Sequence, residues 1–103
     1  MYIVVFVTAK DVTEAQKIAE ALVNGKLAAC VNIVDGVKSI FTWQGKVDKA
    51  DEALLILKSR KSLFPKIVAQ VKKLHSYDCP EVIALPIVGG NKDYLNWIKD
   101  SCV

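Results

Sequence analysis

The chain has 103 residues, of which 52% are hydrophobic and 24% are charged, and its net charge is +3. This length suits one compact domain and is too short for two ordinary ones, and the hydrophobic content excludes intrinsic disorder. The longest apolar run, at the N-terminus, is far below the ~20 residues that a membrane-spanning helix needs. That run also lacks the basic start and the cleavage-like end of a signal peptide. We therefore expect one cytoplasmic domain over residues 1–103, with no membrane partner.

The basic residues are unevenly placed along the chain. Residues 53–77 contain six basic side chains and no acid: Lys58, Arg60, Lys61, Lys66, Lys72 and Lys73. This stretch indicates either an anion-binding face or the solvated face of a helix. All basic residues except Arg60 are lysines, whereas arginine is the better residue for bidentate contacts with phosphates and bases. We expect no specific binding to nucleic acid.

The three cysteines, Cys30, Cys79 and Cys102, contain no C-x-x-C pair. An odd number at these spacings predicts free thiols and a reducing compartment. The only histidine is His75. At these spacings the cysteines and the histidine form no closed set of four zinc ligands, so a structural zinc site would need carboxylates or a second chain.

The first third of the chain predicts a strand followed by a helix. Residues 2–8 are β-branched and aromatic, which is typical of a strand. Asp11 with Glu14 three residues later resembles a capping box. The residues that follow repeat with the period of an amphipathic helix: Ala15, Ile18, Ala19 and Leu22. Gly25 is expected to end this helix in the left-handed conformation.

The middle of the chain predicts more strands. Residues 27–34 form one strand, Asp35-Gly36 is a turn signal, and residues 37–43 continue as a strand. Gln44-Gly45 is a further turn, and residues 52–59, with the sequence LLIL at their centre, form the next strand.

The last part predicts two helices around a strand. Ser62 is expected to cap a helix with Pro65 in its first turn, and one apolar stripe follows: Phe64, Ile67, Val68, Val71 and Leu74. Residues 75–80 form a loop and residues 81–88 a strand. Asn91 is then expected to cap a short helix carrying Tyr94, Leu95, Trp97 and Ile98.

This order, β-α-β-β-α-β with a terminal helix, predicts an α+β, ferredoxin-like fold with both main helices on one face of an antiparallel sheet. Side chains alternate between the faces of a strand, yet residues 3–7 and 54–57 are apolar at successive positions. Both faces of the sheet are therefore apolar. The face without helices is a predicted association surface.

The loop after the second helix carries the candidate metal ligands. His75 and Cys79 are four residues apart, and Asp78 and Glu81 are close by. Imidazole, thiolate and carboxylate together suit copper or zinc. The alternative is a hydrogen-bonded histidine at the end of the helix, where its cation would suit the helix dipole. We do not expect a metal to be required for folding.

Cys30 lies in the small apolar run Ala-Ala-Cys-Val, which fits either core packing or a metal-bound thiolate.

Several activities are excluded by missing motifs. The third strand lacks the exposed aromatics of an RNA-recognition domain, and the chain has no phosphate-binding P-loop and no nucleophile elbow. A Cys–His pair would have no marked oxyanion hole. We expect a protein that is not an enzyme.

Four blocks of sequence carry a resemblance to a known family. They are AACVNIV (28–34), SIFTWQGKV (39–47), EALLILKS (52–59) and HSYDCPEVIALPIVGGNKDYLNWI (75–98). In this order and spacing they cover essentially the whole chain, which resembles the divalent-cation tolerance family, the CutA proteins. The resemblance implies a ferredoxin-like homotrimer with an extended β-hairpin and a short C-terminal helix, similar in architecture to the PII signalling proteins. It also implies a link to divalent-metal tolerance, for which copper binding has been proposed.

The resemblance also points to individual positions. The matching residues are Cys30, Asn32, Trp43, Gly45, Lys58, His75, Tyr77, Pro80, Glu81, Tyr94 and Trp97. Two positions depart from the family: Ser76 stands where a proline is common, and Cys79 is a thiol where many relatives have none. The predicted ligands of a divalent copper-type ion are His75, Cys79, Glu81 and Cys30. The predicted function is metal-ion response; the alternative is a trimeric signalling protein that binds a small anionic ligand at subunit clefts.

Overall fold

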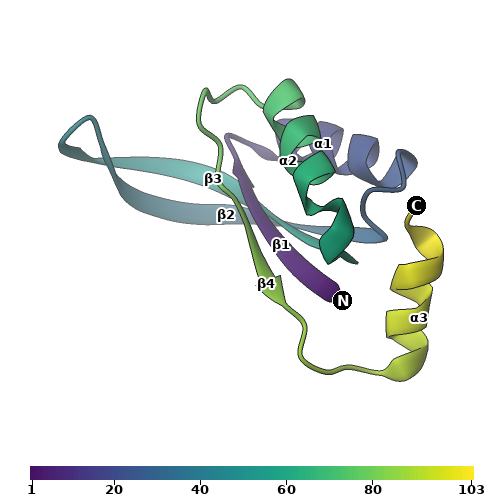
Figure 1. The fold of residues 1–103 in the computed structure, drawn as a ribbon. Coiled ribbons are helices and arrows are strands. Elements are labelled where there is room, and N and C mark those ends of the chain that lie inside the picture. Colours follow the sequence, from purple (N-terminus) through teal and green to yellow (C-terminus); the bar gives the residue numbers. More distant parts are fainter.

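Four strands form one antiparallel sheet in the order β2-β3-β1-β4 in the computed structural model, which describes residues 1–103 (Figure 1). The strands are β1 (Tyr2–Ala9), β2 (Cys30–Trp43), β3 (Lys46–Arg60) and β4 (Val82–Pro86). The helices are α1 (Val12–Asn24), α2 (Phe64–Leu74) and α3 (Lys92–Ser101), and a short 3-10 turn (Lys61–Leu63) precedes α2. This is the predicted ferredoxin-like α+β arrangement with an added C-terminal helix. No helix of the chain combines the length and the apolar character that a membrane span requires.

The core lies between the sheet and the helices α1 and α2, which cover the same face of the sheet (Figure 1). Along β1 the buried side chains alternate with half-buried ones, as the period of a strand requires. The predicted stripe of α1 is buried as expected: Ala15, Ile18, Ala19 and Leu22. The Asp11 side chain caps this helix by accepting from the Glu14 amide at 2.8 Å. Asn91 caps α3 in the same way, accepting from the Asp93 amide at 3.0 Å.

The other face of the sheet carries a second set of apolar side chains. The strand register places Phe6 opposite Ile56 on one side and Ile83 on the other, so these side chains point the same way. We call this surface the open face: Val4, Phe6, Leu54, Ile56, Ile83 and Leu85. Ile83 is 51% exposed. The prediction that the two main helices, α1 and α2, leave an apolar face of the sheet uncovered is confirmed; α3 contacts β3 at one end of the sheet.

Part of the β2–β3 hairpin extends beyond the sheet. β1 pairs with β3 only as far as Ala53, so residues 37–52 form a two-stranded ribbon, which we call the hairpin arm. Figure 1 shows it projecting from one end of the sheet, with α3 at the other end. The arm gives the molecule a length of 44 Å against widths of 25 and 23 Å. Gln44 and Gly45 form its turn, as the sequence predicted, and the structure gives both residues a positive φ.

Three local predictions need correction. Asp35-Gly36 is not a turn between strands; it is an irregularity inside β2, where Gly36 has φ +73° and the register shifts between Val34 and Val37. Gly25 is not left-handed, because its φ is −81°, and Lys26 adopts that conformation with φ 58°. Ser62 does not cap α2, which begins at Phe64 without a side-chain cap because Lys61–Leu63 forms the 3-10 turn. Pro65 does lie in the first turn of α2.

Candidate functional site

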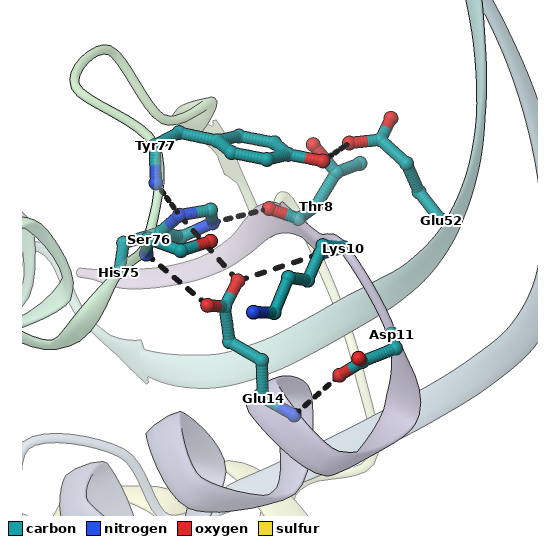
Figure 2. A network of polar contacts seen from close by, with 8 residues as sticks. All are labelled: Thr8, Lys10, Asp11, Glu14, Glu52, His75, Ser76 and Tyr77. Atoms are coloured by element: carbon teal, nitrogen blue, oxygen red, sulfur yellow. Dashed lines mark hydrogen bonds and ion pairs between the residues drawn. The ribbon is translucent and has the colours of Figure 1, made fainter.

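His75 follows the last residue of α2 and its side chain is fully buried. Its Nε2 lies 2.7 Å from the Thr8 carbonyl oxygen, and its Nδ1 lies 3.0 Å from the Tyr77 amide nitrogen (Figure 2). A carbonyl oxygen only accepts, so Nε2 carries the proton and Nδ1 accepts from the Tyr77 amide. Both ring nitrogens therefore have protein partners. The sequence left two roles open for His75, a metal ligand or a hydrogen-bonded histidine, and these contacts correspond to the second.

Glu14 ties the loop after His75 to the start of α1. Its Oε2 accepts from the Ser76 amide at 3.1 Å, and its Oε1 lies 3.4 Å from the Lys10 amide and 3.6 Å from His75 Nδ1 (Figure 2). The sequence indicated Glu14 only as a capping residue. Its second role joins β1, α1 and the loop in one polar network.

Tyr77 and Glu52 form the other half of this network. The Tyr77 hydroxyl donates to Glu52 Oε2 at 2.9 Å, and the Tyr77 ring lies against the His75 ring with centroids 4.7 Å apart (Figure 2). Glu52, in β3 at the base of the hairpin arm, is only 8% exposed. Burial, followed by the hydrogen bond to Glu52 and the nearby carboxylate charges, raises the pKa of Tyr77 to about 12. Glu52 was not singled out from the sequence. It directly precedes the apolar run of β3, and it is the one acid of that strand that is buried.

A pocket of about 590 Å³ opens beside this network, between the hairpin arm and the loop. Its lining includes three aromatic side chains (Phe41, Trp43 and Tyr77), two carboxylates (Glu52 and Glu81) and the Cys79 thiol. Burial, and then the charge of Glu52, raises the pKa of the Glu81 carboxyl. Two of the predicted ligands, Cys79 and Glu81, thus lie around one cavity.

Cys30 lies elsewhere, at the start of β2. It is half-buried opposite Lys58, on the same side of the sheet as the open face, and Lys58 donates to the neighbouring Asn32 side chain. Burial, and then the nearby Cys30 thiol, raises the pKa of Tyr94 in α3. Within the chain no three side chains of His, Cys, Asp or Glu are grouped so as to hold a metal ion. The four predicted ligands are therefore not brought together by one chain.

The Tyr77–Glu52 contact has a measurable signature. We expect Tyr77 to titrate near pH 12 in the folded chain, about two units above the ordinary value of 10.0. Because folding raises this pKa, the contribution of Tyr77 to stability is complete below pH ~10 and is lost as the pH rises to ~12. Ultraviolet titration of phenolate in a Tyr2→Phe/Tyr94→Phe background isolates Tyr77. Glu52→Gln should lower the pKa, and an unchanged value would show that Glu52 has no part in it.

Comparisons with known proteins agree with this fold and with the resemblance. Residues 3–101 match the family model described as "CutA1 divalent ion tolerance protein". The divalent-cation tolerance protein CutA of Thermus thermophilus is 48% identical over 98 residues, covering 95% of each chain. The chloroplastic protein CutA of Arabidopsis thaliana is 50% identical over 96% of this chain, which spans only 54% of that relative's length.

Solved structures give the same result. The divalent cation tolerance protein from Thermus thermophilus has a TM-score of 0.98 at 47% identity, covering 100% of both chains. CutA1 from Oryza sativa has a TM-score of 0.96 at 49% identity, covering 99% of this chain and 94% of that one. The chain belongs to the CutA1 divalent ion tolerance family.

Proposed function

We propose that the chain acts in the response to divalent metal ions, as a homotrimer without enzymatic activity that binds a copper-type ion. The observation that carries the metal proposal is the pocket at the base of the hairpin arm, which Cys79 and Glu81 both line. A thiolate and carboxylates are ligands for borderline ions such as copper and zinc. The names of the relatives, which describe divalent-cation tolerance, support the same class of ligand.

One chain does not supply a complete coordination shell. His75 has both nitrogens hydrogen-bonded, and Cys30 lies at the other end of β2 from the hairpin arm. We therefore place the ion at Cys79 and Glu81, with the missing ligands supplied by a neighbouring copy. This arrangement makes metal binding depend on assembly.

The open face and the hairpin arm support assembly. Both present large apolar side chains to solvent, including Ile40, Trp43, Val47, Ile83 and Leu85. Contiguous apolar surface of this kind marks an interaction site. A heterologous contact between the arm of one copy and the open face of the next gives a ring when the rotation between copies closes. The resemblance to the CutA proteins implies that this ring contains three copies of the chain.

Both nitrogens of His75 are hydrogen-bonded, so His75 is not available as the base of a Cys–His pair, which supports a role without this kind of catalysis. Three free cysteines support the reducing, cytoplasmic location that we propose. The alternative, a small anionic ligand, is not favoured at this pocket, since Glu52 and Glu81 would repel an anion.

Copper titration of two cysteine variants tests the proposal. Cys79→Ser should weaken copper binding by at least about tenfold, because a ligating thiolate is replaced by a poor ligand. Cys102→Ser is the matched control, since Cys102 lies beside Ser59 and packs against the core. Calorimetry at fixed chain concentration measures both affinities. Equal weakening in the two variants, or no copper or zinc binding by the wild type, would refute the assignment.

A further inference from the structure

Negative charge is concentrated at the base of the hairpin arm, although the chain carries a net charge of +3. A second, smaller cavity that shares Glu52 with the pocket is lined by four acids and one lysine: Asp11, Asp35, Asp51, Glu52 and Lys10. The lysine on the pocket side, Lys38, is already paired with Asp51 at 2.6 Å. The local field around the pocket therefore favours a cation.

Glu52 is the strongest sign of a missing partner. Its residue is more than nine-tenths buried, and its only hydrogen bond is the one from the Tyr77 hydroxyl to Oε2. No lysine, arginine or histidine nitrogen of the chain lies within ion-pair distance of it. No buried side-chain oxygen of the chain lacks a hydrogen-bond partner, so the second oxygen of Glu52, Oε1, keeps contact with solvent. Oε1 faces no protein donor and remains free to accept from a ligand.

The other walls of the pocket show which kind of cation fits. Phe41, Trp43 and Tyr77 supply aromatic rings, and Ile40 and Pro80 supply further apolar surface. Aromatic rings attract cations through their electron-rich faces, and clusters of such rings are a common recognition site for organic ammonium ions. The volume of about 590 Å³ lies in the range of small-molecule sites and is far larger than a bare metal ion needs.

We propose that this pocket binds a small organic ammonium ion. Its charged nitrogen donates to the free oxygen of Glu52, with Glu81 as the second carboxylate, and its carbon chain lies along Trp43 and Phe41. This inference goes beyond the proposed metal response. It shares the Glu81 carboxylate with that proposal but needs no thiol, because the ligand is held by carboxylates and aromatic rings.

The test compares a cation with its neutral counterpart on the whole protein. Calorimetric titration with n-butylammonium should show saturable binding, whereas n-butanol, which has the same carbon chain without the charge, should show none. Glu52→Gln keeps an acceptor for Tyr77 and removes the charge, so the affinity for n-butylammonium should fall by at least about tenfold. Glu20→Gln, an equal change of charge on an exposed residue of α1, is the control and should leave the affinity unchanged.

Trp43→Leu is a second variant, and it leaves the buried carboxylate in place. Because Trp43 is 51% exposed, the substitution should not disturb folding. Loss of the aromatic face should weaken n-butylammonium binding by about threefold or more. Equal binding of n-butylammonium and n-butanol, or an unchanged affinity in both variants, would overturn the inference. Copper titration of the same variants separates the two proposals: copper binding with no n-butylammonium binding would overturn this one and leave the metal role standing.

Discussion

Ile83→Asp is expected to convert the proposed homotrimer into single chains. Ile83 lies at the edge of the open face, opposite Phe6 in the strand register, and is 51% exposed in one chain. In the single chain a carboxylate at this position remains hydrated. In an assembly that buries the open face it would lose its water without gaining a partner, at a cost of several kcal/mol per copy. Light scattering should then give one chain mass of 11.3 kDa in place of about three.

Val23→Asp is the matched control for this experiment. Val23 is an equally branched, partly exposed residue (41%), but it lies on α1, away from the open face. It should leave the mass of the assembly unchanged. A wild-type chain that is already a monomer at micromolar concentration, or an Ile83→Asp variant with the wild-type mass, would contradict the proposed interface.

His75→Ala is expected to lower the free energy of unfolding by about 2–4 kcal/mol, even in the absence of any metal. The substitution empties a fully buried site and leaves the Tyr77 amide and the Thr8 carbonyl without the ring nitrogens that they contact. The Tyr77 ring also loses its neighbour. Urea unfolding with added chelator, at one chain concentration for all variants, measures the change.

Lys73→Ala is the control for His75, since Lys73 is an exposed residue of the last turn of α2 and should cost less than about 0.5 kcal/mol. A loss of stability at His75 that appears only when metal is present would instead support a ligand role for this residue. Metal-independent loss assigns His75 to the network that holds the loop.

Most of the fold could be predicted because local patterns and long-range pairing agree. The apolar stripes of α1 and α2 and the successive apolar residues of β1 and β3 each allow one arrangement, with helices on one face and a bare apolar face opposite. Asp35-Gly36 misled the prediction because its turn preference is local. Pairing of β2 with β3 on both sides of it overrides that preference and absorbs the pair as an irregularity.

The site could be predicted only in part. The loop from His75 to Glu81 was indicated by its residue types, but the partners that define it come from distant parts of the chain. Glu14 lies 62 positions before Ser76, and Glu52 lies 25 positions before Tyr77. Only the tertiary fold brings them together: the spacing from Asp11 marks Glu14 as a capping residue but not as a partner of the loop, and no spacing in the sequence marks Glu52. The basic stretch gave no comparable signal for the pocket, which is acidic.

The hairpin arm also determines how folding and association are related. A ribbon of only two strands is marginally stable by itself in water, and residues 37–52 have no third strand from their own chain. If neighbouring copies cover the arm, the arm becomes ordered only in the assembly. The free energy needed to order residues 37–52 is then part of the free energy of association. Mass action then makes the unfolding midpoint rise with protein concentration, so a single concentration does not define the stability of this chain.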